Sequence, residues 1–154
     1  MRARKVKGLD PAGSLQDNAR RIVAVRAQEV LDLGAAAQDP FDPRALHDLR
    51  IAAKRLRYLL ELTGVGGANS VKPLKRLQDV LGEIHDCDVH LPAVRRLARE
   101  SPEREARGLR TLATHFATRR AELFERFHQE WPEYERTFTP LSHAADGNPL
   151  EVGS

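Results

Sequence analysis

The chain has 154 residues, of which 41% are hydrophobic and 31% charged, and this balance predicts one globular domain with its own core. The net charge of +3 is unevenly distributed, because residues 1–80 carry 15 Lys and Arg against 9 acids and the remainder 10 against 13. The aromatic fraction of 5% and the scarcity of β-branched runs argue against a sheet protein. Helix-forming Ala, Leu, Arg and Glu dominate the periodic segments, which predicts an all-α fold. A single Cys87, no membrane-length apolar run and no signal peptide predict a cytoplasmic protein with no membrane contact.

The first helix is expected from the N-cap Ser14 to about Leu33, just before Gly34. Residues 1–13 are basic with nothing to bury, which predicts a mobile arm. On the helical wheel Arg26 falls in the middle of the apolar face. A buried guanidinium is costly unless it is paired or hydrated, so Arg26 must reach an acid, extend past the apolar residues to water, or line a polar cavity.

The second helix begins with Asp42 as N-cap and Pro43 in the first turn, and the glycines from Gly64 on end it. Its stretch HDLRIAAKRLRY places four cationic or titratable side chains in a stripe about 80° wide beside the apolar face. We call this stripe the cationic ladder: His47, Arg50, Lys54 and Arg57. No acid at the intervening turn relieves their mutual repulsion. The alternatives are a solvated basic face and a polyanion-binding face, and the position beside the core favours the second.

The third helix is expected to open near Ser70, to kink or restart at Pro92, and to continue to about Arg99. One flank carries polar positions and a glycine, while Asp88 falls inside the apolar arc. That glycine, Gly82, predicts a point where another helix or a ligand approaches the backbone closely. The polar flank consists of Lys75, Gln78, His85 and Asp86.

The last helix is expected to start at Ser101-Pro102, and Arg120 lies in the centre of its apolar face. Periodicity is lost after Trp131-Pro132. Short connections predict an antiparallel four-helix bundle over residues 14–135, followed by an irregular or disordered tail over residues 136–154.

Catalytic and metal chemistry find little support in the sequence. His85, Asp86, Asp88 and His90 are close together, but their helical pairs point in different directions, so we expect no metal or other cofactor. A histidine/aspartate metal-binding domain stays as an alternative function. Cys87 lies between aspartates, where a thiolate is disfavoured, and we expect no catalytic residue. Nucleic acid is not an expected partner, because the cations follow the core and no aromatic stacking platform accompanies them.

The segments ALHDLRIAAKRLRYLLE and LKRLQDVLGEIHDCDV resemble the CHAD family, the conserved histidine α-helical domain. The first places Arg55 beside the ladder residues on the family's His-x-x-Arg-x-x-x-[Arg/Lys]-Arg-x-Arg pattern. The resemblance implies a helical bundle that binds inorganic polyphosphate in a basic groove and is not an enzyme. The residues it implies as polyphosphate contacts are His47, Arg50, Lys54, Arg55, Arg57 and Lys75, to which we add Arg26, Arg120 and His85.

The chain is short for this family, whose full domain is built from two related four-helix halves. This sequence has room for one half and resembles the second. We therefore expect a two-fold homodimer whose ladders face one shared basic groove, with Ile51 and Tyr58 among the contacts. Association with polyphosphate granules fits this interpretation. The alternative is a structural or adaptor module that docks on an acidic protein or a granule surface.

Overall fold

A computed structural model describes residues 2–147 of the chain. Four α-helices follow one another, and within this range there is no strand. The helices are α1 (Leu15–Ala36), α2 (Pro43–Thr63), α3 (Gly67–Glu100) and α4 (Glu103–Ser142), and a short 3₁₀ helix, η1 (Ala144–Asp146), follows them. The predicted all-α fold is confirmed.

Short-range hydrogen bonds set the start of the first two helices. The Ser14 side chain accepts the backbone N–H of Asp17 and so caps α1. The Asp42 carboxylate accepts two backbone N–H groups of the first turn of α2, while Pro43 occupies a position where no N–H is needed. Gly64 ends α2 in the left-handed conformation, with φ at 71°. These ends were predicted correctly because each signal acts within one turn.

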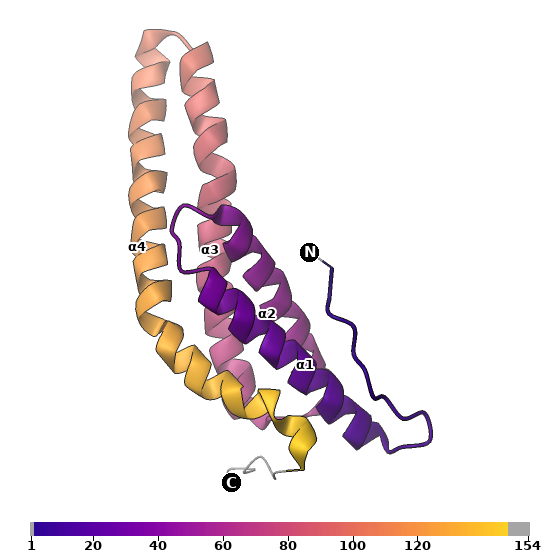
Figure 1. Cartoon of the computed structure of the whole chain (residues 1–154). Coiled ribbons are helices and arrows are strands. Elements are labelled where there is room, and N and C mark those ends of the chain that lie inside the picture. Colours follow the sequence, from indigo (N-terminus) through magenta and orange to yellow (C-terminus); the bar gives the residue numbers. More distant parts are fainter. Residues whose placement is uncertain (1, 148–154) are drawn as a thin grey trace.

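The four helices form a ring in which α1 packs on α2 and α4, and α3 packs on the same two helices from the opposite side. Successive helices run antiparallel, as Figure 1 shows. With 34 and 40 residues, α3 and α4 are much longer than α1 and α2, so their joined ends extend past the bundle as a two-helix hairpin (Figure 1). We call residues 95–113 the distal hairpin. None of the helices in the described range is long and apolar enough to cross a membrane.

The last helix does not end after Pro132 as predicted, and α3 does not restart at Pro92. α3 continues without interruption through Pro92, and α4 continues through Pro132 and Pro140 to Ser142. An internal proline removes one hydrogen bond, and burial of Phe138 and Leu141, each at most 1% exposed, favours continuation of α4. The irregular tail predicted from residue 136 is therefore wrong for residues 136–142, and residues 148–154 lie outside the described range.

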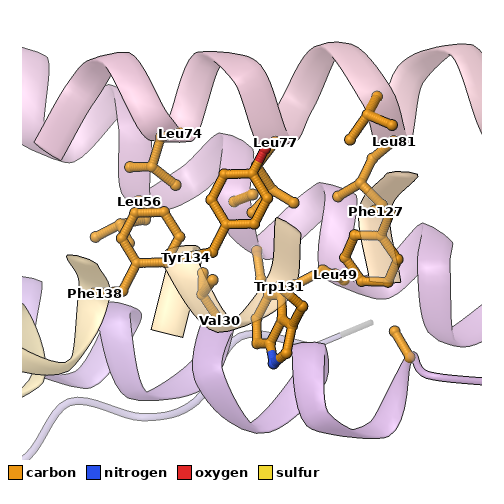
Figure 2. Close-up of a cluster of buried hydrophobic side chains, with 14 of the residues drawn as sticks. Val30, Leu49, Leu56, Leu74, Leu77, Leu81, Phe127, Trp131, Tyr134 and Phe138 are labelled. Carbon is orange, nitrogen blue, oxygen red and sulfur yellow. The ribbon is translucent and has the colours of Figure 1, made fainter. Parts of the chain in front are cut away.

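The centre of the bundle is an aromatic row on α4 that packs against leucines of α2 and α3 (Figure 2). Ring centroids of Phe127 and Trp131 are 5.8 Å apart, and those of Trp131 and Tyr134 are 6.4 Å apart. The Tyr134 hydroxyl donates to Glu130 at 2.8 Å, and burial together with this bond raises the pKa of the phenol. Because the sequence loses its periodicity after Trp131-Pro132, the last two turns of this row, which include Tyr134 and Phe138, were not predicted.

Gly34 lies inside α1, so the predicted end of this helix at Leu33 is wrong by three residues. The Trp131 indole occupies the space where a side chain at position 34 would be, since a Cβ there would lie 1.6 Å from Trp131 Cη2. Glycine is needed at this position for close packing of α4 on α1. In a sequence, a glycine that ends a helix looks the same as a glycine near the helix end on which another helix packs closely.

The basic N-terminal arm lies along α1 (Figure 1). The Arg4 backbone N–H donates to Glu29 at 3.0 Å, and the Arg4 guanidinium lies 2.7 Å from the Asp32 carboxylate. Further along, the Asp10 N–H donates to the Asn18 side chain. Residues 2–13 form no helix or strand, in agreement with the sequence, but they contact α1, which was not expected.

Candidate anion-binding site

The cationic ladder of α2 and the polar flank of α3 form one surface. The His47 and His85 rings lie with their centroids 5.3 Å apart, which joins the first ladder position to α3. At the other end, Glu61 lies 3.9 Å from the Arg57 guanidinium and 3.8 Å from Lys75 Nζ. Because α2 and α3 are antiparallel, the ladder and flank residues between these two contacts lie on the same side of the helix pair. We call this surface the cationic strip, made of His47, Arg50, Lys54, Arg57, Lys75, Gln78, Gly82 and His85; the exposed Asp86 of the polar flank follows at its His85 end.

Two arginines of the strip are partly buried, and at least part of each guanidinium group has no hydrogen-bond partner within residues 2–147. Leu49 and Leu56 are fully buried on the adjacent face of α2, and this packing holds the ladder at the edge of the core. Arg50 is half-buried and has no hydrogen-bond or ion-pair partner anywhere in residues 2–147. The Nε of Arg57 is buried and also has no hydrogen-bond partner there. Partly desolvated guanidinium groups of this kind gain most from an anion that accepts their N–H groups.

Tyr58 and Glu61 support the strip, and neither role was predicted. The Arg57 guanidinium lies 5.0 Å and Lys54 Nζ 5.7 Å from the centroid of the half-exposed Tyr58 ring, so cation–π attraction holds both side chains. Glu61 is the acid that the sequence interpretation overlooked, although it follows Arg57 by four residues. Both of its ion pairs are long, and the Glu61 and Lys75 side chains are exposed, so Glu61 neutralises the strip only weakly.

Arg55 is not part of this surface. It lies about 120° around α2 from the middle of the ladder, the flank that meets α3 at His85. Its side chain is half-buried there. A sequence pattern that includes adjacent residues cannot place them all on one face of a helix, and the structure separates Arg55 from the other predicted contacts.

Arg26 is paired on its own helix. Its guanidinium donates to Glu29 at 3.0 Å, and the two side chains are only 16% and 4% exposed. Of the three solutions that the sequence left open, the structure therefore shows pairing with an acid. α1 lies diagonally opposite α3 in the ring, so Arg26 is not brought to the cationic strip.

Arg120 connects three parts of the bundle instead of lining the strip. It pairs with Asp88 of α3, and its Nη1 donates to the Pro40 carbonyl in the α1–α2 loop at 2.8 Å. The two charged side chains are 16% and 22% exposed. Arg120, which was expected from the sequence to contact polyphosphate, is thus held by Asp88 instead.

Arg120→Met should destabilise the fold by about 2 kcal/mol, because it leaves the Asp88 carboxylate and the Pro40 carbonyl without their donor in a partly buried place. Urea unfolding measures the loss. The neighbouring Arg119→Met is the matched control, since it breaks a pair with Glu83 whose side chains are 45% and 47% exposed and should cost under about 1 kcal/mol. Equal losses in the two variants would contradict the assigned role of Arg120.

The side chains considered as metal ligands have other contacts. The His85 ring lies against His47, Asp88 pairs with Arg120, and the His90 ring lies 5.6 Å from Phe116. No group of three or more His, Cys, Asp or Glu residues within 2–147 is arranged to hold a metal ion. Cys87 is buried, and burial together with the nearby Asp88 charge raises the pKa of its thiol.

Gly82 does not receive a neighbouring helix, contrary to one of the two roles predicted for it. A Cβ built at this position would meet no side chain or other helix within 4 Å among the described residues, and the position is only half-buried. Glycine in the middle of a helix costs about 1 kcal/mol relative to alanine. The packing of the fold therefore gives no reason for glycine here, in contrast to Gly34.

One family model, described as the CHAD domain, matches residues 2–95. The match covers α1, α2 and most of α3, and thus every residue of the cationic strip. It begins earlier and ends earlier than the range of residues 14–135 predicted for the bundle. No curated protein and no solved structure matches the chain.

Proposed function

This chain belongs to the CHAD family, and on that premise we propose that it binds inorganic polyphosphate, without catalysis, through the cationic strip. The observation that carries the proposal is that the cationic ladder and the polar flank, which were predicted separately from the sequence, lie side by side in the structure. The ladder of α2 and the Lys75–His85 flank of α3 form one surface, and Arg50 has no anionic partner within the described chain.

The chemistry of the polymer suits such a surface. Polyphosphate carries about one negative charge per phosphate at a short repeat and has no bases to read, so its recognition depends on charge and hydrogen bonding. The ladder presents cations at steps of one helical turn, about 5.4 Å. Arginine forks donate two N–H groups to a phosphate, while lysine supplies a compact charge.

Chain-length dependence tests the proposal. Titrations with orthophosphate, triphosphate and long-chain polyphosphate should show affinity per molecule that rises with chain length, because linked phosphates engage several cations at once. The affinity should fall as salt is raised. Equal affinity for orthophosphate and the long polymer would contradict the proposal. Tight binding of poly-glutamate in place of polyphosphate would favour the adaptor alternative, and steady release of phosphate would contradict the absence of catalysis.

We further propose that two copies of the chain associate around one polymer. Leu62, 84% exposed, and the half-exposed Tyr58 share the outer face of α2 with Ile51, and these apolar side chains can offset repulsion between two ladders. A bridging polyanion should strengthen the dimer by mass action. Sedimentation velocity with and without polyphosphate checks this, and a strict monomer that binds the polymer tightly would exclude it.

A further inference from the structure

Gly82 and Arg50 occupy corresponding positions on the two helices of the cationic strip. The rings of His47 and His85 mark a point where α2 and α3 touch. Arg50 follows His47 by three residues on α2, and Gly82 precedes His85 by three residues on α3. Because the helices are antiparallel, both steps lead in the same direction away from this contact, by about 4.5 Å of helix rise. An arginine that has no partner within residues 2–147 thus lies level with the position of α3 that lacks a side chain.

Nothing in the fold explains this glycine. It lies in the middle of the 34-residue helix α3, it is not among the glycines with positive φ, and no neighbouring atom fills the place of its Cβ. An alanine would fit the protein without a clash and would be the better helix former. The remaining reason for a glycine at this position is a bound ligand that occupies the space next to the backbone.

We propose that Gly82 is the point at which the bound polyphosphate chain lies against the backbone of α3, with one phosphate between this backbone and the Arg50 guanidinium. The inference rests on the proposed function. It assigns to Gly82 the role of leaving room for a slender polyanion between α2 and α3. A side chain at position 82 would project between Gln78 and His85 and hold the polymer away from α3. Arg50 and the α3 flank could then no longer reach the same phosphate.

The same substitution at two glycines separates this role from helix stability. Gly108, in the second turn of α4 within the distal hairpin, is exposed, and a Cβ built there would likewise meet no side chain or other helix within 4 Å. Gly82→Ala and Gly108→Ala should both raise Tm, by about 3 °C for a domain of this size. Only Gly82→Ala should weaken binding of long-chain polyphosphate, by about tenfold, the effect expected for one lost charge-assisted contact. Gly82→Leu should weaken binding further, with Tm still at or above that of the unaltered protein.

The outcomes distinguish the inference from the function on which it rests. If the unaltered protein binds long-chain polyphosphate and Gly82→Ala and Gly82→Leu bind it equally well, the close approach is wrong while the proposed function stands. If Gly82→Ala lowers Tm, position 82 has a packing role and the inference is also overturned. If the unaltered protein does not bind polyphosphate, the proposed function fails and the inference fails with it. Weaker binding by Gly82→Ala with a raised Tm, next to unchanged binding by Gly108→Ala, supports it.

Discussion

Replacing Arg50, Lys54 and Arg57 together by alanine should abolish polyphosphate binding and leave the bundle folded. A hydrogen bond to a charged group contributes about 1.5–3 kcal/mol, so losing three should lower the affinity at least about 1,000-fold. Alanine has the highest helix propensity, and none of the three residues is fully buried. Isothermal titration with long-chain polyphosphate measures the loss, and circular dichroism checks the fold.

A control with the same change in net charge shows whether position matters. Arg96, Arg104 and Arg107 are exposed on the distal hairpin, and their triple alanine variant should keep nearly all of the binding. An equal loss in both triple variants would mean that binding follows net charge alone. In the opposite direction, Glu61→Gln removes the carboxylate near Arg57 and Lys75 and should strengthen binding.

Gly34→Ala should lower the free energy of unfolding by about 3 kcal/mol, even though alanine favours the helix. The new methyl group would overlap the indole of Trp131, a residue that is 5% exposed and whose ring packs against both Phe127 and Tyr134. The ring cannot move without disturbing the aromatic row in Figure 2. Urea unfolding monitored by circular dichroism measures the change.

Two comparisons identify the cause of this loss. Gly108→Ala should be stabilising, because the same substitution meets open space there. Gly34→Ala combined with Trp131→Leu should cost less than the sum of the two single changes, since the smaller side chain makes room for the methyl group. A neutral effect of Gly34→Ala alone would show that Trp131 is not firmly held.

Local signals in the sequence were sufficient to predict those features of the fold that are formed by residues within one turn of a helix. Ser14 and Asp42 set the starts of α1 and α2 because each side chain accepts backbone N–H groups two or three residues ahead. The ladder was recognisable because helical periodicity alone puts its members on one face. The pairs Arg26–Glu29 and Arg57–Glu61 are equally local, and spacings of three and four residues could have indicated them.

Contacts between helices were decided by the tertiary structure, because they depend on register and rotation that no single helix specifies. The pairing of Arg120 with Asp88 joins α4 to α3, and the meeting of His47 with His85 aligns α2 with α3. Likewise, the sequence marked Gly82 as a close approach and Gly34 as a helix end, whereas Trp131 packs on Gly34 and the space beside Gly82 is open. A glycine has no side chain whose pattern could reveal its neighbour, so only the position of the other helix determines which glycine is packed and which is left free.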